Sequence, residues 1–304
     1  MPATGSLFAL LLLLTLALPC FGMVAPITVL YPKVPSPYDE IFRQIISGIE
    51  QHYPGPVDLQ QLDSETAIAQ SAEALSQQPE RLVIALGKSG YSVAKKIYQS
   101  STVVVGALPI QPNGISGVSL LAEPKVLFES LKLLAPEVRR VVVLYTAYNS
   151  WLINMDKVQA TELGLQLDAR EVVDLKDAIN QYQQLMSTLD PGIDALWIPL
   201  DPVTANEQVI LPKLLEVAWE RNLVLFSSKP EHAKRGALFS MFPNHQQLGR
   251  ELAGMVQQLH QHKIKAGVVP LQQVQLAVNL RTAAHLGKGY SAEIRRSFAI
   301  TFQK

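Results

Sequence analysis

The sequence has very little cysteine, since Cys20 is the only one among its 304 residues. Cys20 lies in an N-terminal segment that we expect to be removed, so the rest of the chain contains no thiol. This absence excludes disulfide bonds, cysteine nucleophiles and thiolate metal sites together. We therefore expect the folded chain to be stable on its hydrophobic core alone.

The sequence also lacks an excess of charge of either sign. It has 26 basic and 26 acidic residues and a formal net charge of zero. No run of Lys or Arg provides the electrostatic footprint that binds DNA, RNA or an anionic membrane surface. Because 48% of the residues are hydrophobic and 17% are charged, the chain is not a disordered protein. We expect a packed globular protein with no nucleic-acid partner.

A long apolar run occurs only near the N-terminus, where residues 7–18 read LFALLLLLTLAL. These twelve residues are too few to span a bilayer, which requires about 20. The run is typical of a secretory signal, although no Lys or Arg precedes it. We predict a signal peptide over residues 1–22, cleavage after Gly22 and a periplasmic location. Cys20 stands where a lipoprotein signal places its lipidated residue, but Pro19 before it fits poorly, so soluble export is favoured over a lipid anchor.

Complete catalytic motifs are absent as well. Gly87-Lys88-Ser89 resembles the end of a phosphate-binding loop, but Leu82 occupies the position of an essential glycine. Ser92 and Lys95 match an S-x-x-K motif, but the K-S-G that should follow comes before them and no S-D-N occurs. Neither G-x-S-x-G nor H-E-x-x-H is found, and the six histidines lack zinc-binding spacing. We expect no enzyme, no metal and no cofactor.

Beyond residue 26, short β-branched runs alternate with longer amphipathic stretches. Strings such as LVIAL indicate strands buried on both faces, which is typical of parallel sheets covered by helices. Helix starts are predicted at Ser36-Pro37, Ser64, Pro124 and Asn244. The expected strands are residues 27–31, 57–62, 82–86, 102–106, 140–145, 165–172, 195–200, 222–226, 236–242 and 274–280.

About ten strands exceed what one doubly wound sheet usually holds. The predicted fold class is therefore α/β, with two doubly wound parallel-sheet lobes joined by a multi-strand hinge. Turn-rich segments place crossings near Asn113-Gly114, at residues 229–235 and at residues 267–270. The predicted first lobe comprises residues 27–119 plus 236–268, and the second lobe comprises residues 120–234 plus 270–304.

Ligands of open α/β sheets lie beyond the carboxyl ends of the strands. The first residues after each predicted strand are therefore candidates for binding a small polar or zwitterionic molecule. A ligand carboxylate would meet the start of a helix at residues 88–90, and its amine would meet an aspartate on the facing lobe. Helix capping is an alternative role for Ser36, Asn149 and Asp201. The candidate ligand-binding residues are Ser36, Lys88, Ser89, Gly90, Tyr145, Asn149, Ser150, Asp201 and Ser227.

Several segments carry a resemblance to a known family. They are PNGISGVS (112–119), LFESLKLLAPEVRRVVVLY (127–145), Asn149-Ser150, DALWIPLD (194–201), GALFSMFPNHQQLGRELAGMVQQL (236–259) and VNLRTAAHLG (278–287). Together they resemble the tryptophan/tyrosine-type substrate-binding proteins of bacterial ABC transporters, which have the type I periplasmic binding fold. The resemblance implies a monomer that closes on a small, amino-acid-like ligand for an ABC permease, with Asn149, Ser150 and Asp201 lining the cleft.

Two turns depart from the family pattern. Lys88-Ser89-Gly90 replaces a Thr-centred turn, and Ala107-Leu108-Pro109 replaces an Asp-Pro, so the identity of the ligand stays open. Two alternatives also stay open: a binding protein that feeds a membrane sensor, and a two-lobed α/β enzyme. An enzyme requires paired acid and base groups, and Lys88 with Asp201 is the one charged pair that the predicted cleft offers.

Overall fold

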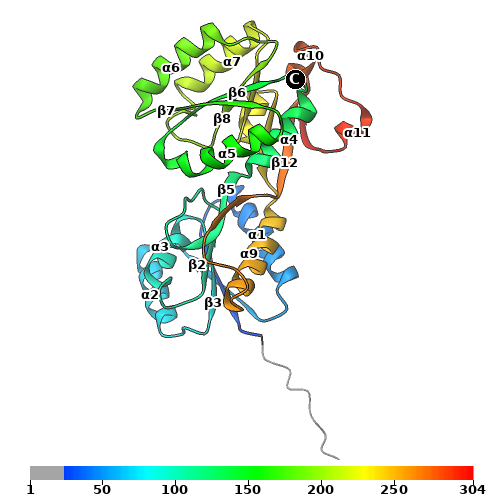
Figure 1. The fold of residues 1–304 in the computed structure, drawn as a ribbon. Coiled ribbons are helices and arrows are strands. Elements are labelled where there is room, and N and C mark those ends of the chain that lie inside the picture. The colour runs from blue at the N-terminus through cyan, green and yellow to red at the C-terminus, as the bar shows by residue number, and fades with distance from the viewer. Residues whose placement is uncertain (1–23, 304) are drawn as a thin grey trace, which may run out of the picture.

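The computed structural model describes residues 24–303, which form two α/β lobes, one above the other in Figure 1. The predicted signal peptide, Cys20 and the cleavage site lie outside the described residues. The first lobe contains a six-stranded parallel sheet in the order β11-β5-β4-β3-β1-β2. Its elements are β1 (Ile27–Pro32), α1 (Tyr38–His52), β2 (Val57–Leu62), α2 (Glu65–Ser76), β3 (Leu82–Leu86), α3 (Gly87–Ile97), β4 (Val103–Gly106), β5 (Ser116–Ala122), α9 (His245–His260) and β11 (Val268–Leu271).

The second lobe contains a seven-stranded sheet in the order β13-β12-β10-β9-β8-β6-β7. Its only antiparallel neighbours are β10 and β12. Its elements are α4 (Pro124–Leu134), β6 (Arg140–Tyr145), η1 (Ala147–Asn149), α5 (Ser150–Glu162), β7 (Gln166–Glu171), α6 (Leu175–Thr188), β8 (Asp194–Ile198), α7 (Ile210–Glu220), β9 (Val224–Ser227), α8 (Pro230–Arg235), β10 (Phe239–Pro243), β12 (Val274–Asn279), α10 (Leu280–His285), α11 (Ala292–Arg295) and β13 (Phe298–Phe302).

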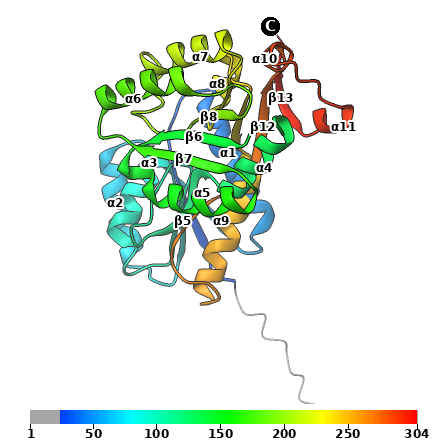
Figure 2. The same ribbon diagram turned by 45° about the horizontal axis from the view of Figure 1, so that its top comes forward.

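The predicted fold class of two α/β lobes is confirmed. Strands β3 and β8 are buried along their whole length, as expected for strands with helices on both sides. Two hydrophobic clusters cover each sheet, and the turned view in Figure 2 shows helices on both faces. In the second lobe, Trp197 stacks on Phe226, which stacks on Phe239 with 5.0 Å between the ring centroids.

The chain passes between the lobes at three points, and the sheets place them differently from the sequence prediction. Residues 229–235 do not form a crossing, because α8 and the positive φ of Gly236 return the chain to the second sheet. There β10 pairs with β9 and β12, so residues 239–243 are not part of the first sheet. Asn113-Gly114 lies between two strands of the first sheet, and β5 extends to Ala122 before the chain leaves that sheet.

The hinge consists of the three segments that connect the two sheets. They lie between β5 and α4, between β10 and α9, and between β11 and β12. Backbone hydrogen bonds join them to one another, from Glu123 N–H to Leu271 O (2.8 Å) and from Asn244 N–H to Gln273 O (2.9 Å). Because several hydrogen-bonded segments share the connection, relative motion of the lobes is restricted to bending and twisting of these segments.

Helices α1 and α9 lie side by side in the first lobe and approach very closely (Figure 1). A Cβ atom on Gly48 would lie 2.0 Å from the carbonyl oxygen of Gln246, and one on Gly249 would lie 2.0 Å from that of Ile45. Both distances are far below van der Waals contact, so each helix needs a glycine at the crossing point. This contact fixes α9 in the first lobe directly after the chain has left the second.

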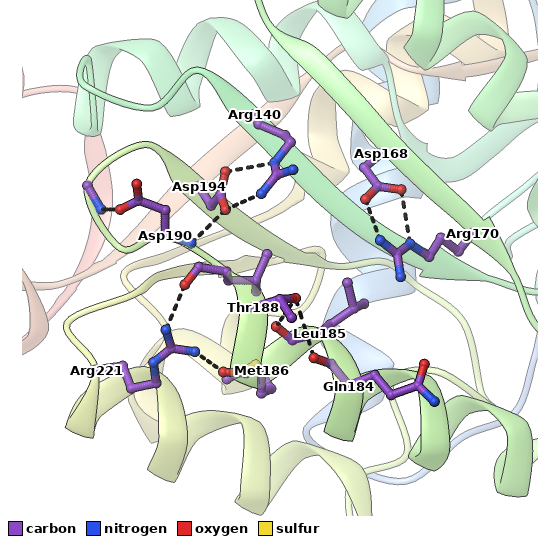
Figure 3. A network of polar contacts seen from close by, with 12 residues as sticks. Arg140, Asp168, Arg170, Gln184, Leu185, Met186, Thr188, Asp190, Asp194 and Arg221 are labelled. Atoms are coloured by element: carbon purple, nitrogen blue, oxygen red, sulfur yellow. Dashed lines mark hydrogen bonds and ion pairs between the residues drawn. The ribbon is translucent and has the colours of Figure 1, made fainter.

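Polar contacts fix the amino ends of the strands in the second lobe (Figure 3). Arg140 Nε donates to Asp194 Oδ1 (2.8 Å), and the Asp190 N–H donates to Asp194 Oδ2 (2.7 Å). Burial alone would raise the pKa of Asp194, but the Arg140 guanidinium holds that pKa below its usual value. Arg221 bonds the carbonyl groups at the end of α6. Among residues 24–303, no helix combines the length and apolar character needed to cross a membrane.

Candidate functional site

The loops after the strands of one lobe face those of the other lobe. The Tyr148 hydroxyl, in the turn after β6, donates to the carbonyl oxygen of Pro109, in the loop after β4, over 2.7 Å. The two sheets therefore present their carboxyl ends to each other, as the prediction of an interlobe site requires. The candidate residues can now be placed relative to this boundary.

Asp201 is 2% exposed and lies at the carboxyl end of β8. Its Oδ2 accepts hydrogen bonds from the Thr146 N–H (2.9 Å), the Thr146 hydroxyl (2.7 Å) and the Asn149 side-chain amide (2.9 Å). Its Oδ1 accepts from the N–H groups of Val203 (2.9 Å) and Thr204 (3.1 Å). A carboxylate offers about four lone-pair sites, so these five donors leave no room for a ligand amine. Asp201 therefore joins the loops after β6 and β8.

The alternative role of Asp201 as a helix cap holds for a single turn of the chain but not for a helix. Residues 202–205 form turns, and α7 begins only at Ile210. Asp201 instead accepts the N–H groups two and three residues further along, which is the local hydrogen-bonding pattern of an aspartate in a turn.

Asn149 is 1% exposed and immediately precedes α5. Its side chain makes no capping hydrogen bond, because its amide group donates to Asp201 instead. Its Oδ1 is buried and has no partner in the described part of the chain. A buried polar atom without a partner is unusual and requires an explanation. Ser150 is half-buried and is the first residue of α5.

Lys88, Ser89 and Gly90 lie in the first turn of α3, directly beyond β3. The N-cap residue of α3 is Leu86, whose side chain cannot accept a hydrogen bond. The first N–H groups of α3 therefore have no capping acceptor. Lys88 is exposed and Ser89 is half-buried. Gly90 is buried, and a Cβ there would lie 2.9 Å from the backbone carbon of Ala85. Gly90 therefore permits close packing of α3 on the sheet.

Ser36, Tyr145 and Ser227 lie in different environments. Ser36 is exposed and does not cap α1, whose N-cap position is Pro37. Tyr145 is buried, and burial followed by the charge of Glu171 raises its pKa. Ser227 is fully buried, and its hydroxyl pairs with Nδ1 of His232 at 2.7 Å. The hydroxyl of Ser227 therefore points into the second lobe.

The list of candidate residues leaves out Thr146 and Tyr148, although both lie in the loop after a predicted strand, between Tyr145 and Asn149. Thr146 gives two hydrogen bonds to Asp201. Tyr148 is 37% exposed, and burial followed by the neighbouring Tyr91 raises its pKa, so the phenol keeps its proton at neutral pH. The available signal was the criterion used for the other candidates, because Thr146 and Tyr148 also bring polar groups to the loop that follows a strand.

One arrangement of residues resembles a catalytic triad but cannot act as one. Ser227 pairs with His232, whose Nε2 lies 3.8 Å from Glu207. Both the serine and the histidine are fully buried, so a substrate has no access to the hydroxyl. Burial, followed by the charge of Lys229, lowers the pKa of His232 to about 4. Within residues 24–303, no group of three His, Cys, Asp or Glu residues is arranged to hold a metal ion.

Two cavities differ in their position relative to the boundary between the lobes. One of ≈ 650 Å³ is lined by the residues that precede β8 and β9, at the amino ends of these strands. Another of ≈ 390 Å³ lies between α1 and the edge strand β2 and includes Tyr31 and Pro32 at the carboxyl end of β1. The first is on the wrong side of its sheet for the predicted site, whereas the second approaches the loop that contains Ser36.

Solved structures of low sequence identity share this fold. An ABC domain in complex with L-Trp from Streptococcus pneumonia is 17% identical, with a TM-score of 0.52 over 91% of this chain and 100% of that one. The ligand-free, open structure of a substrate-binding protein with adhesive properties from Clostridium difficile is 16% identical, with a TM-score of 0.61 over 92% of this chain and 100% of that one. A periplasmic ribose ABC transporter structure from Conexibacter woesei is 11% identical, with a TM-score of 0.52 over 90% and 98% of the two chains.

These similarities confirm the type I periplasmic binding fold. No curated protein sequence matches the chain. The family model of ABC transporter substrate binding proteins matches residues 62–298, well over half of the chain, and spans both lobes. The match agrees with the resemblance carried by the segments from residue 112 to residue 287. The chain belongs to the ABC transporter substrate-binding protein family.

Proposed function

We propose that this protein captures a small, amino-acid-like solute between its two lobes and delivers it to an ABC permease. The observation that carries the proposal is Asn149. It lies where the family resemblance places the ligand, at the carboxyl end of a strand that faces the other lobe, and its buried Oδ1 lacks a donor. Once the residues that cover this oxygen move aside, the ammonium group of the solute supplies the missing donor. Family membership makes solute capture the function to which this atom contributes.

The carboxylate of the solute binds, in this proposal, at the start of α3. The helix has eleven residues and no side-chain cap, so its first N–H groups and its dipole favour an anion. Lys88 adds a positive charge at the same end, and Ser89 adds a hydroxyl. Gly90 acts through packing, because its missing side chain lets α3 lie close to the sheet.

The amine binds at Asn149 rather than at Asp201. The five donors around Asp201 occupy both of its oxygens, whereas Asn149 Oδ1 is unpartnered. Asp201 contributes as a positioning residue, because it binds the Asn149 amide and so determines where Oδ1 lies. Ser150 follows as the first residue of α5 and is close enough in sequence to share the same ligand group.

Family membership and the N-terminal sequence support the location and the partner that we propose. Residues 1–22 act as an export signal, so the protein works in the periplasm as a soluble monomer, with a lipid anchor at Cys20 as the less favoured form. Closure of the two lobes produces the surface that the permease recognises. A membrane sensor would recognise the same closed state, and co-purification with either partner distinguishes the two.

Calorimetry with one L-amino acid and its two analogues tests the proposal. A thermal-shift screen first identifies a ligand, since a solute at a hundred times its dissociation constant stabilises the protein by about 2.7 kcal/mol. The decarboxylated and the deaminated analogues should then each bind about 10- to 100-fold more weakly, because each loses one charge-assisted hydrogen bond. Lys88→Met should weaken binding, whereas Lys96→Met, an exposed lysine near the other end of α3, should not. Equal binding of the parent and both analogues contradicts the proposal.

A further inference from the structure

The carbonyl group of Pro109 is held rigidly at the edge of the first lobe. Its neighbours on both sides are buried, and both are tied to the strand that follows. The Leu108 carbonyl accepts from the Leu120 N–H (3.1 Å), and the Ile110 N–H donates to the buried hydroxyl of Ser119 (3.1 Å). The exposed Pro109 between them therefore presents its carbonyl oxygen in a fixed position.

The turn that carries Tyr148 is held equally firmly in the second lobe. Thr146 and Asn149, on either side of it, both donate to Oδ2 of Asp201. The same carboxylate is fixed by the N–H groups of Val203 and Thr204. Asp201 therefore clamps the short helical turn and so determines where the phenol of Tyr148 points.

The bond between these two rigid parts is unusual in its position. Within residues 24–303, no other hydrogen bond or ion pair of a side chain joins the two lobes outside the hinge. A second tyrosine, Tyr91 of α3, lies near enough to influence Tyr148. Its own hydroxyl accepts from the Asn113 amide over 2.7 Å, which secures this part of the first lobe as well.

We propose that the Tyr148 phenol is a latch that holds the two lobes together in the unliganded protein, with Asp201 as the residue that positions it. The latch deepens the proposed function and rests on it, because Tyr148 directly precedes Asn149 in the turn that the proposed site uses. It favours a partly closed state before any solute arrives. A solute enters in the intervals when the latch is open, and the same hydrogen bond then favours closure of the lobes on the solute. A neutral hydrogen bond of this kind changes the ratio of latched to open molecules by about two- to tenfold.

Distances between spin labels in the two lobes measure this ratio without any ligand. Because Cys20 is the only native cysteine, a Cys20→Ser background with Gln70→Cys on α2 and Asn180→Cys on α6 carries one label in each lobe. Both positions are exposed on helices. Tyr148→Phe removes only the hydroxyl and should shift the distance distribution toward longer values. Thr146→Val removes one bond to Asp201 and should shift it in the same direction by a smaller amount.

Tyr38→Phe is the matched control, because Tyr38 is 62% exposed at the start of α1, on the carboxyl edge of the same lobe as Pro109. It should leave the distances unchanged. Tyr148→Phe and Tyr38→Phe should unfold at temperatures close to that of the parent, whereas Thr146→Val should unfold at a lower temperature because it loses one hydrogen bond to the Asp201 carboxylate. Superimposable distributions for Tyr148→Phe and the parent overturn the latch, and so does an equal shift in Tyr38→Phe. A shift in Tyr148→Phe alone, without one in Thr146→Val, overturns the role of Asp201. Since no solute is present, a failure of the latch is distinct from a failure of solute capture.

Discussion

Replacement of Asp201 by asparagine should reduce the stability of the unliganded protein strongly. The two oxygens of Asp201 accept five hydrogen bonds, three at Oδ2 and two at Oδ1. Asparagine keeps one oxygen, which satisfies the three donors from Thr146 and Asn149. Its NH₂ group then faces the N–H groups of Val203 and Thr204, so two hydrogen bonds are replaced by donor-to-donor contacts. Hydrogen bonds to a charged acceptor contribute about 1.5–3 kcal/mol each, so the free energy of unfolding should fall by about 3–6 kcal/mol.

Urea unfolding followed by circular dichroism measures this difference, and thermal unfolding should show a loss of about 6 °C or more. Asp190→Asn is the matched control, because Asp190 is exposed and its carboxylate accepts one hydrogen bond, from the Gly192 N–H. That change should cost less than about 1 kcal/mol. If Asp201→Asn unfolds within 1 kcal/mol of the parent, as it would if Asp201 served only a ligand amine, the positioning role of Asp201 is refuted.

Gly249→Ala should cost about 3 kcal/mol, because its Cβ would lie 2.0 Å from a carbonyl oxygen of α1, whereas Gly267→Ala, with nothing within 4 Å of its Cβ, should be neutral in the same denaturation assay. Asp156 has both carboxylate oxygens buried without partners, and burial raises its pKa well above the usual value, so stability falls as the pH rises through that pKa. Asp156→Asn should therefore be more stabilising at pH 8 than at pH 4. Burial lowers the pKa of His232 from 6.5 to about 4, so the folded protein should lose about 3 kcal/mol as the pH falls from about 6.5 to about 4, and His232→Gln should flatten that part of the stability profile.

Much of the fold could be predicted because it depends on local patterns. Buried strands appear as unbroken apolar runs, and Leu82–Leu86 forms β3 as predicted. The caps at Ser64 and Asn244 are also confirmed, since each side chain accepts from the N–H three residues later. The β-branched pattern was weaker at Ser116–Ala122 and Val268–Leu271, which pair with each other as β5 and β11. This pairing joins residues about 150 apart in the chain, which local patterns do not reveal.

The lobe boundary that was predicted after β9 shows a second limit. Lys229 to Arg235 contains proline and charged residues, which favour a connection, and these residues do form the short helix α8. Whether a connection changes lobes depends on which sheet the next strand completes. Phe239 stacks on Phe226 of the second sheet, and this tertiary contact keeps β10 there. The chain leaves the lobe only after Pro243, where a proline ends the strand and Asn244 caps the next helix.

The candidate site shows why residue type alone does not identify a ligand contact. Asp201 and Asn149 were both selected as polar residues after strands, but the structure binds them to each other. A carboxylate in that position is the strongest acceptor available, so the nearest backbone and side-chain donors saturate it during folding. The amide of Asn149 has both a donor and an acceptor, and Asp201 can satisfy only the donor. The pairing itself therefore leaves the other acceptor, Oδ1, without a partner. Our proposal places the ammonium group of the solute at this neutral residue and not at the charged one beside it.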